Sequence, residues 1–202
     1  RVLRYPRGKV LGGSTAINGM VAIRGQAADY DAWAAAGLTG WAWRDVLPFF
    51  VRSENHVLRA SSTHGQCGPW RVDKARMHWR VLDDVRHAAV QAGIPSTDDF
   101  NTGNNEGVGP IHVNQHRGAR WSAADGYLKP VLKRPNLRVV TDAMVNQIVF
   151  SPAEPLRARG VLWRDAAGGL HTAHAHRSVI LAAGAFGSPH LLLRSGLGPA
   201  AH

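Results

Sequence analysis

Two glycine-rich stretches contain the residue types that hold a phosphate group or a flat ring. The first is "GKVLGGSTAING" (8–19), with four glycines, two adjacent hydroxyl side chains and one amide. Glycines let the backbone approach a ligand closely, and hydroxyls can bond to phosphate oxygens. The spacing is not that of a P-loop, and no predicted strand precedes it as a dinucleotide fingerprint requires. By itself the stretch favours either a cofactor cradle or a flexible loop.

The second stretch is "VILAAGAFGSPHLLLRSGLGP" (179–199). Its pattern predicts an apolar strand over 178–183, a turn at Gly184, and a helix over 188–194 that Ser188 caps. Strand, tight turn and helix form one step of a doubly wound sheet, and such a helix N-terminus attracts phosphate. A glycine at a strand end can equally serve packing, so both interpretations stay open.

Other reactive residue types are interpreted as structural. "HTAHAH" (171–176) could supply imidazoles to a metal, but no nearby carboxylate or thiol completes the set, and an exposed hairpin strand is favoured. The pairs Asp83–Asp84 and Asp98–Asp99 are expected to cap helices or lie in loops. Cys67, the only cysteine, is expected to be an inert loop residue.

Three helices are predicted to position these residues. The first covers 28–37, with Asp29 as N-cap and Gly37 at its end. The second covers 40–55, where Pro48 is expected to bend or shorten it. The third is the amphipathic segment 80–95.

The remaining segments are predicted to be irregular or β. Residues 17–23 read as a short helix or irregular turn, 55–75 as loop or extended chain, and 98–110 as turns. From 136 onwards the spacing of apolar residues changes to the alternation typical of β-strands. This predicts two short strands within 137–150 and a hairpin around 165–169.

The composition of the 202-residue chain indicates a folded protein. It is 45% hydrophobic, with no apolar run approaching the roughly 20 residues of a membrane helix, so no membrane span is expected. A single cysteine excludes an intrachain disulfide and mildly favours the cytoplasm, with localisation otherwise open. The net charge of +10 suggests nucleic-acid binding as one possible function. The basic residues are mostly scattered arginines, however, so no nucleic-acid partner is expected.

Taken together, the two glycine-rich motifs resemble the signatures of a known family. "GKVLGGSTAINGMVAIRGQAADYD" (8–31) and "GAFGSPHLLLRSGLG" (184–198) are similar to the first and second signatures of the glucose-methanol-choline (GMC) oxidoreductases, close to their choline and alcohol dehydrogenase-type members. Blocks in between, such as "EGVGPIHVNQHRGARWSAADGYLKP", resemble family segments in the same order. The resemblance covers nearly the whole chain.

The resemblance implies an α/β fold, α+β overall. It would comprise part of an FAD-binding doubly wound domain with a β-hairpin or meander, and part of a substrate-binding domain. Residues 1–57 would form an FAD-contacting segment and lid, 58–132 a partial substrate-binding domain, and 133–202 a partial FAD-binding domain with its strand, turn and helix.

The implied cofactor is FAD, and the implied cofactor-binding residues come from three places. Val10, Gly12, Gly13 and Ser14 would line the diphosphate and ribityl side, Asn18, Gly19, Met20 and Val21 the isoalloxazine ring, Val145 the adenine, and Ala183 and Gly184 the ribose and diphosphate. Some relatives attach FAD through a His just before that Asn. This chain has Ile17 there, so non-covalent FAD is expected.

The implied reaction is oxidation of a small alcohol to an aldehyde or ketone, by hydride transfer to flavin N5. The family's dinucleotide turn and catalytic His are expected outside this chain, so no catalytic residue and no metal ligand is assigned in it. The chain is therefore expected to be an inactive internal piece of a longer enzyme. A non-catalytic truncated remnant is the alternative, and a basic nucleic-acid-binding protein is favoured less. The particular alcohol and the electron acceptor stay open.

Overall fold

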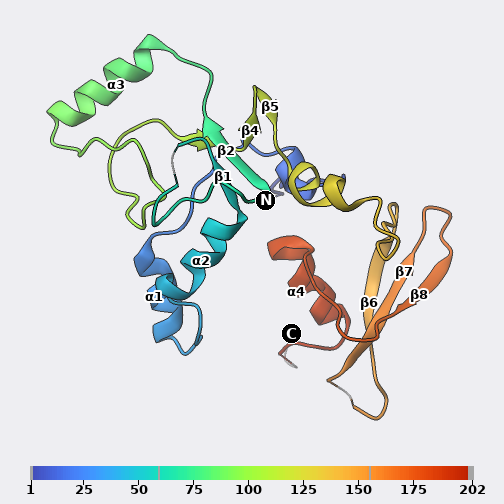
Figure 1. Ribbon diagram of the computed structural model, residues 1–202. Helices are drawn as coiled ribbons and strands as arrows, with labels where there is room; N and C mark the ends of the chain where they lie inside the picture. The colour runs from blue at the N-terminus through green and yellow to red at the C-terminus, as the bar shows by residue number, and fades with distance from the viewer. Residues whose placement is uncertain (1, 59, 155, 200–202) are drawn as a thin grey trace. The chain divides into compact units, whose positions relative to one another are not determined.

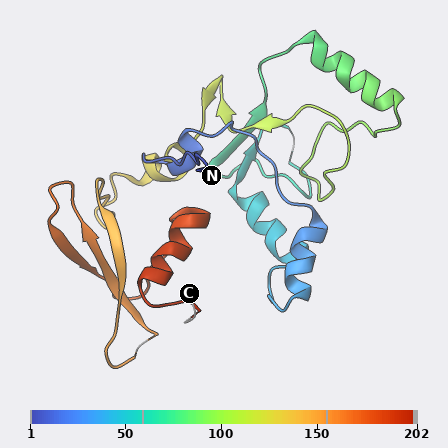
Figure 2. The ribbon, with the colours of Figure 1, turned by 180° about the vertical axis from the view of Figure 1, so that it is seen from behind.

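The computed structural model describes residues 2–58, 60–154 and 156–199. The chain forms two compact units, Arg1–Leu137 and Arg138–His202 (Figures 1 and 2). Helices and sheets occur in both, as the α/β prediction requires.

Three α-helices of the first unit confirm the predicted ones. They are α1 (Ala27–Ala35), α2 (Trp43–Ser53) and α3 (Arg80–Gln91). The prediction that Asp29 caps α1 was wrong: Gln26 is the N-cap, and Asp29, three residues later, accepts the Gln26 backbone N–H at 2.8 Å. The two form a capping box, in which both residues satisfy amides of the first turn.

Pro48 lies inside α2 without ending it. Because it falls in the second turn, it removes one intrahelical hydrogen bond only. An aromatic cluster joins α1 and α2, in which the Tyr30 ring lies 5.6 Å from Trp43 and 5.8 Å from Phe50. Ring contacts of this kind fix the two helices against each other.

The strands of the first unit are short. β1 (Glu54–His56) pairs in parallel with β2 (Trp70–Lys74), which pairs antiparallel with β3 (His112–Val113). β4 (Gln115–His116) and β5 (Ala119–Arg120) form a hairpin. Part of the segment 55–75 is therefore extended, one of the two predicted alternatives. A 3-10 turn, η1 (Gly13–Ala16), a π-helical turn, η2 (Ala124–Leu128), and a second 3-10 turn, η3 (Lys129–Val131), complete the unit.

The interior of the first unit is largely polar. Among its described residues, Val72 and Ala124 are the buried apolar ones. The buried polar side chains are more numerous: Glu54, His56, His64, Asn101, His112, Asn114, Gln115 and Ser122. Since burying polar groups without partners is costly, hydrogen bonds must hold much of this interior together.

The second unit is an antiparallel sheet with one helix. β6 (Met144–Phe150), β7 (Ala158–Arg164) and β8 (Leu170–His174) follow in order, which confirms the predicted hairpin around 165–169. α4 (Gly184–Arg194) packs on β6, where Ile148 and Leu191 are buried. One strand forms within 137–150 instead of the two predicted.

The predicted strand over 178–183 does not form. No neighbouring strand offers it a hydrogen-bonding ladder among the residues that the structure describes, and Ile180 is 85% exposed. α4 also begins at Gly184, four residues before the predicted start. Ser188 is therefore not its N-cap; its Oγ instead accepts the Ala183 N–H at 3.0 Å, from inside the helix.

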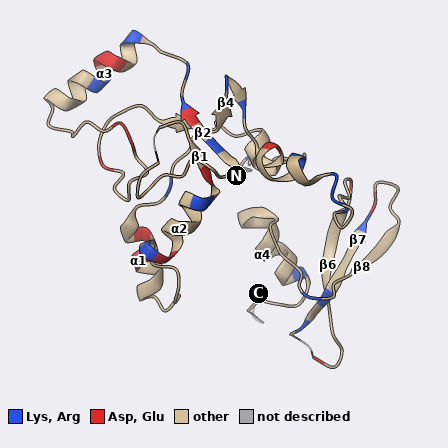
Figure 3. Cartoon of the chain, in the orientation of Figure 1, with Lys and Arg blue, Asp and Glu red and all other residues tan. Residues whose placement is uncertain are grey.

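Lys and Arg residues are distributed over helices, strands and loops of both units (Figure 3). Over the ranges described above, no helix has the length and apolar character needed to cross a bilayer.

Candidate functional site

The first glycine-rich motif forms a tight turn in the first unit. Gly12 and Gly13 have φ angles of +92° and +56°, which favour glycine, and the Gly13 N–H donates to the Val10 carbonyl at 2.8 Å. Ser14 Oγ accepts the Gly8 N–H at 3.2 Å. A Cβ on Gly12 would lie 3.1 Å from Ser122 Oγ, so this glycine permits a close approach between two segments.

The segment around β5 and η2 anchors this turn. The Ala123 N–H donates to Thr15 Oγ1 at 2.9 Å. The Arg120 guanidinium donates to the Thr15 carbonyl at 3.1 Å and to Asn18 Oδ1 at 2.9 Å. Contacts across more than 100 sequence positions therefore hold the motif's shape.

After Met20 the chain is extended at Val21, where it forms a β-bridge with Val113, and it is bonded along one edge. Met20 has a φ of +63°, and its N–H donates to Asn18 Oδ1 at 3.1 Å. The Met20 carbonyl then accepts the Asn114 N–H at 2.7 Å, and the Ala22 N–H donates to the His112 carbonyl at 3.0 Å. The predicted irregular turn thus leads into a short bridge beside β3.

The motif leaves open space where a flat ring or a diphosphate could lie. A Cβ built on Gly13 or on Gly19 would meet no atom within 4 Å. The side chains of Val10 and Val21 are 55% and 51% exposed. Glycine edges beside exposed apolar side chains fit the diphosphate and ring of a flavin dinucleotide.

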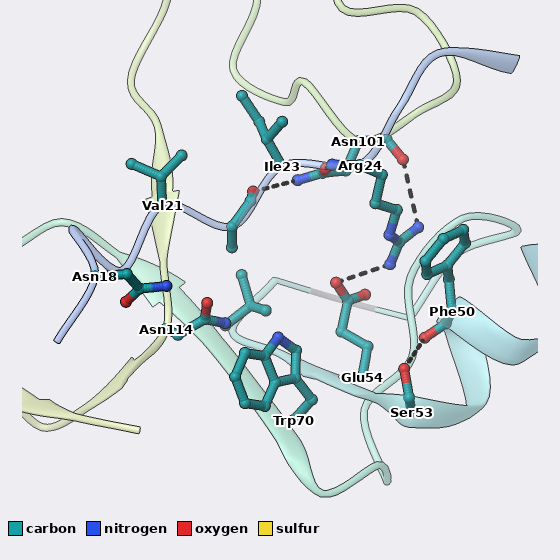
Figure 4. A pocket seen from close by; sticks show the side chains of 12 residues that line it. Asn18, Val21, Ile23, Arg24, Phe50, Ser53, Glu54, Trp70, Asn101 and Asn114 are labelled. Atoms are coloured by element: carbon teal, nitrogen blue, oxygen red, sulfur yellow. Dashed lines mark hydrogen bonds and ion pairs between the residues drawn. The ribbon is translucent and has the colours of Figure 1, made fainter. Parts of the chain in front are cut away.

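A pocket of about 260 Å³ lies beside the extended chain (Figure 4). Its lining combines the motif with α2, β1 and β2, and consists of Asn18, Val21, Ala22, Ile23, Arg24, Phe50, Ser53, Glu54, Trp70, Val72, Asn101 and Asn114. In Figure 4 the Arg24 guanidinium points toward Glu54 and Asn101. The pocket therefore joins apolar surface to a charged wall.

Four charged side chains form a network behind that wall. Arg24 Nη2 lies 2.8 Å from Glu54 Oε1. The His64 ring lies between two carboxylates, with Nδ1 2.7 Å from Glu54 Oε2 and Nε2 2.7 Å from Asp99 Oδ2. The Arg24, Glu54 and His64 side chains are each less than 10% exposed.

The network shifts the pKa values of His64, Asp99 and Glu54. Burial lowers the pKa of His64, but its hydrogen bonds to Asp99 and Glu54 outweigh burial and raise that pKa to about 9. Burial opposes ionisation of Asp99, yet the hydrogen bond from His64 holds its pKa at about 2. For Glu54, the hydrogen bond from His64 and the charge of Arg24 likewise overcome burial and lower the pKa. All four side chains are charged at neutral pH.

Two further histidines lie beside His64 and are neutral. The His56 ring stacks on it at 4.0 Å, and the His112 ring meets His56 edge-on at 4.8 Å. Burial and the charge of His64 lower the pKa of His56 to about 4. Burial also lowers the pKa of His112. One imidazolium and two neutral imidazoles therefore share this interior.

The eleven predicted cofactor residues fall into two groups. The eight from Val10 to Val21 lie together on the turn and the extended chain of the first unit. The other three lie in the second unit: Val145 is on β6 opposite Trp163, Ala183 is the N-cap of α4, and Gly184, with a φ of +85°, is the first residue of that helix.

Sequence reasoning missed the charged network. The sequence predicted no role for His64, and Asp99 was expected only to cap a helix or lie in a loop. Asp99 does hold its loop, through the Asn101 N–H at 2.8 Å, but it also bonds to His64. No local pattern signals these pairs, because their members come from separate segments.

The other polar residues considered from the sequence have ordinary structural contacts. Asp83 pairs with His78 and Asp98 with Arg86, each at 2.8 Å. His171 bonds to Asp165 at 2.7 Å, and Cys67 is exposed. Within the part of the chain that the structure describes, no group of three or more His, Cys, Asp or Glu side chains could hold a metal ion.

Comparison with known proteins supports the family resemblance over the whole chain. The family model "GMC oxidoreductase" matches residues 1–202. An oxygen-dependent choline dehydrogenase of Brucella ovis is 46% identical over 202 residues, which are 100% of this chain and 36% of that protein.

Two solved structures share the fold. Pyridoxine 4-oxidase from Mesorbium loti is 33% identical with a TM-score of 0.87, over 96% of this chain and 38% of that one. An FAD-dependent oxidoreductase from Chaetomium thermophilum is 30% identical with a TM-score of 0.88, over 96% of this chain and 35% of that one. The chain thus spans little more than a third of the length of each relative. With a full-length family match and a glycine turn that fits a flavin, the chain belongs to the GMC oxidoreductases, whose cofactor is FAD.

Proposed function

We propose that the protein containing this chain oxidises the CH–OH group of a small alcohol to an aldehyde or ketone. The observation that carries the proposal is the match of the whole chain to the GMC family, combined with the open glycine turn of residues 12–19. Bound FAD would accept the hydride removed from the alcohol carbon, which carries both electrons, while the hydroxyl proton leaves separately.

The residues of the chain would hold and orient the cofactor. Backbone at Gly12, Gly13 and Ser14, with Val10 beside it, would lie along the diphosphate and ribityl side. Asn18, Gly19, Met20 and Val21 would lie along the ring, where backbone N–H groups stabilise developing negative charge. Val145, Ala183 and Gly184 would contribute to the adenine, ribose and diphosphate.

Arg120 has a supporting role in this proposal. Its guanidinium fixes Asn18 Oδ1 at 2.9 Å, and the Met20 N–H bonds to the same oxygen at 3.1 Å. The side chain of Asn18 is therefore oriented before any ligand binds, which lowers the entropic cost of binding.

We propose a separate role for each of three consecutive segments of the chain. Residues 1–57 would contact FAD and contribute a lid, 58–132 would belong to the substrate-binding domain, and 133–202 to the FAD-binding domain. In support of the last division, a compact unit begins at Arg138.

Flavin reduction tests the function directly. The protein expressed from the complete reading frame that encodes this chain is purified with FAD and mixed, without oxygen, with choline, pyridoxine and benzyl alcohol. We expect at least one alcohol to bleach the oxidised flavin absorbance and to yield the carbonyl product. An FAD-loaded protein that a broad panel of alcohols leaves oxidised would contradict the proposal and favour a non-catalytic remnant.

A binding experiment tests whether the positive charge of the chain serves to bind nucleic acid. We propose that nucleic acid is not a partner, because Lys and Arg are spread over both units (Figure 3). A salt-sensitive gel shift at physiological ionic strength would contradict this.

A further inference from the structure

A closed ring of hydrogen bonds and ion pairs links residues 18–24, called the flavin-facing segment because Asn18–Val21 are proposed to line the flavin, to two other segments. Arg24 forms an ion pair with Glu54, Glu54 bonds to His64, and His64 bonds to Asp99, at the distances given above. Asp99 Oδ1 accepts the Asn101 N–H at 2.8 Å, and Asn101 Oδ1 accepts the backbone N–H of Arg24 at 2.7 Å, which closes the ring.

The ring requires a doubly protonated His64. Each of its ring nitrogens lies 2.7 Å from a carboxylate oxygen, and an ionised carboxylate can only accept. Both nitrogens must therefore carry protons. Arg24 and His64 then balance Glu54 and Asp99, whereas a neutral His64 would leave one negative charge in excess and one carboxylate without its donor.

The ring fixes backbone atoms of the flavin-facing segment. The Asn101 side chain donates from Nδ2 to the Ala22 carbonyl at 3.0 Å while it accepts from Arg24 N. Asn105 donates to the Arg24 carbonyl at 2.8 Å. On its other side, the segment bonds to Asn114 and His112. Residues 20–24 are thus held from both edges.

Stability alone does not account for the ring. Apolar side chains of the same volume commonly stabilise a fold as well as, or better than, a buried ion-pair network. Directional hydrogen bonds instead specify where backbone atoms lie. In this protein those atoms are at Ala22 and Arg24, directly after Asn18–Val21.

We propose that His64 is a positioning residue of the flavin site: as an imidazolium between Glu54 and Asp99, it completes the ring that holds Ala22–Arg24 and so fixes the flavin-facing residues Asn18–Val21. This inference rests on the proposed function, because the ring is taken to act on bound FAD.

The groups that face His64 come from several elements. Glu54 and His56 lie on β1, Asp99 on the 98–110 loop and Arg24 on the flavin-facing segment. His112 on β3 and Lys74 at the end of β2 act at longer range, through the neutral imidazoles. Only His64 among the three imidazoles is held by two carboxylates.

The test compares His64→Gln with two further variants in the FAD-loaded protein from the complete reading frame. Glutamine can still donate to one carboxylate but carries no charge. The double variant His64→Gln/Asp99→Asn restores the charge balance. His171→Gln is the matched control, since His171 makes a similar 2.7 Å contact to Asp165 on the exposed hairpin of the second unit.

We expect His64→Gln to retain FAD but to change the visible circular dichroism of the flavin. Its kcat should fall on the order of 10- to 100-fold, because the isoalloxazine ring of the flavin would be misplaced. In the wild-type protein, kcat should fall as pH rises through about 9, and this fall should be absent from His64→Gln. The double variant should recover part of kcat, and His171→Gln should leave all three readouts unchanged.

Each outcome decides the inference. Wild-type spectrum, kcat and pH profile in a folded His64→Gln protein would overturn it while leaving the proposed function intact. A wild-type protein that binds no FAD would overturn both. Should His64→Gln fail to fold, Asp99→Asn alone tests the ring from its more exposed end. We expect the same changes in circular dichroism and kcat, with the alkaline fall of kcat moved to lower pH because His64 keeps only its bond to Glu54. A wild-type spectrum, kcat and pH profile in Asp99→Asn would overturn the inference.

Discussion

The Nε2 atom of His64 lies 2.7 Å from Oδ2 of Asp99, although the two residues are 35 positions apart in the sequence. Asp99 belongs to a glycine-rich loop that contains no helix or strand, and His64 lies in the loop between β1 and β2. Their contact holds the loop that contains Asp99 against the interior of the first unit. It should also make the stability of that unit depend on pH.

The stability of the first unit should fall on the alkaline side because of His64. Its folded pKa of about 9 lies above the ordinary value of 6.5, so its stabilisation is complete below about 6.5 and is lost as pH rises through about 9. The loss should be on the order of 3 kcal/mol. Urea unfolding of the apoprotein between these pH values measures it. In His64→Gln the same series should be nearly flat, and a wild-type curve equally flat would refute the assignment.

Replacing Arg24 should destabilise the protein more than replacing an arginine in an exposed ion pair. Arg24→Met leaves Glu54 buried without its guanidinium partner, and we expect a loss of about 3–5 kcal/mol. Arg86→Met is the control, because its pair with Asp98 is exposed and should contribute less than about 1 kcal/mol. Equal effects of the two substitutions on urea midpoints would contradict the buried network.

Two glycines of the first motif should separate folding from flavin binding. Gly12→Ala places a Cβ 3.1 Å from Ser122 Oγ at a φ of +92°, which should cost about 2 kcal/mol of stability. Gly19→Ala meets open space, so its stability should change by less than about 0.5 kcal/mol. Its FAD affinity should nevertheless fall on the order of tenfold, since the methyl group enters the proposed ring site. Flavin titration and unfolding of both variants check this, and unchanged affinity in Gly19→Ala would place the ring elsewhere.

Ser195 should be important for the second unit. Its Oγ accepts the Ile148 N–H at 2.8 Å and donates to the Leu191 carbonyl at 2.6 Å, which joins β6 to the end of α4. Ser195→Ala leaves the Ile148 amide without this acceptor, and we expect a loss of about 1–3 kcal/mol. Thr172→Ala on the exposed strand β8 should stay within about 0.5 kcal/mol. Thermal melts that rank the two variants in the opposite order would refute the role of Ser195.

Flavin should be released when the protein is denatured. Ile17 carries no nucleophile at the position where some relatives attach FAD through His, so acid precipitation should leave all the flavin in the supernatant. Yellow colour or flavin fluorescence in the washed precipitate would show a covalent bond formed elsewhere. Supernatant flavin is quantified by absorbance against the protein precipitated.

The elements that sequence reasoning predicted correctly are those with strong local signals. The prediction of α1 rested on the glycine at its end and those of α2 and α3 on helical periodicity, whereas the hairpin of β7 and β8 follows from alternation around a turn. The strand predicted over 178–183 was wrong because apolar sequence alone does not make a strand; the backbone needs a neighbouring ladder. The cap of α1 was wrong because Gln26 and Asp29 act as a pair.

The sequence by itself determined the family, through two long glycine-rich signatures, in which glycines permit a close approach of the backbone to a ligand. Only the tertiary structure decided which polar side chains hold residues 22–24, next to the proposed flavin-binding residues. Arg24, Glu54, His64 and Asp99 carry no shared local pattern, and their charges became a balanced buried ring only when folding brought three distant segments within hydrogen-bond distance.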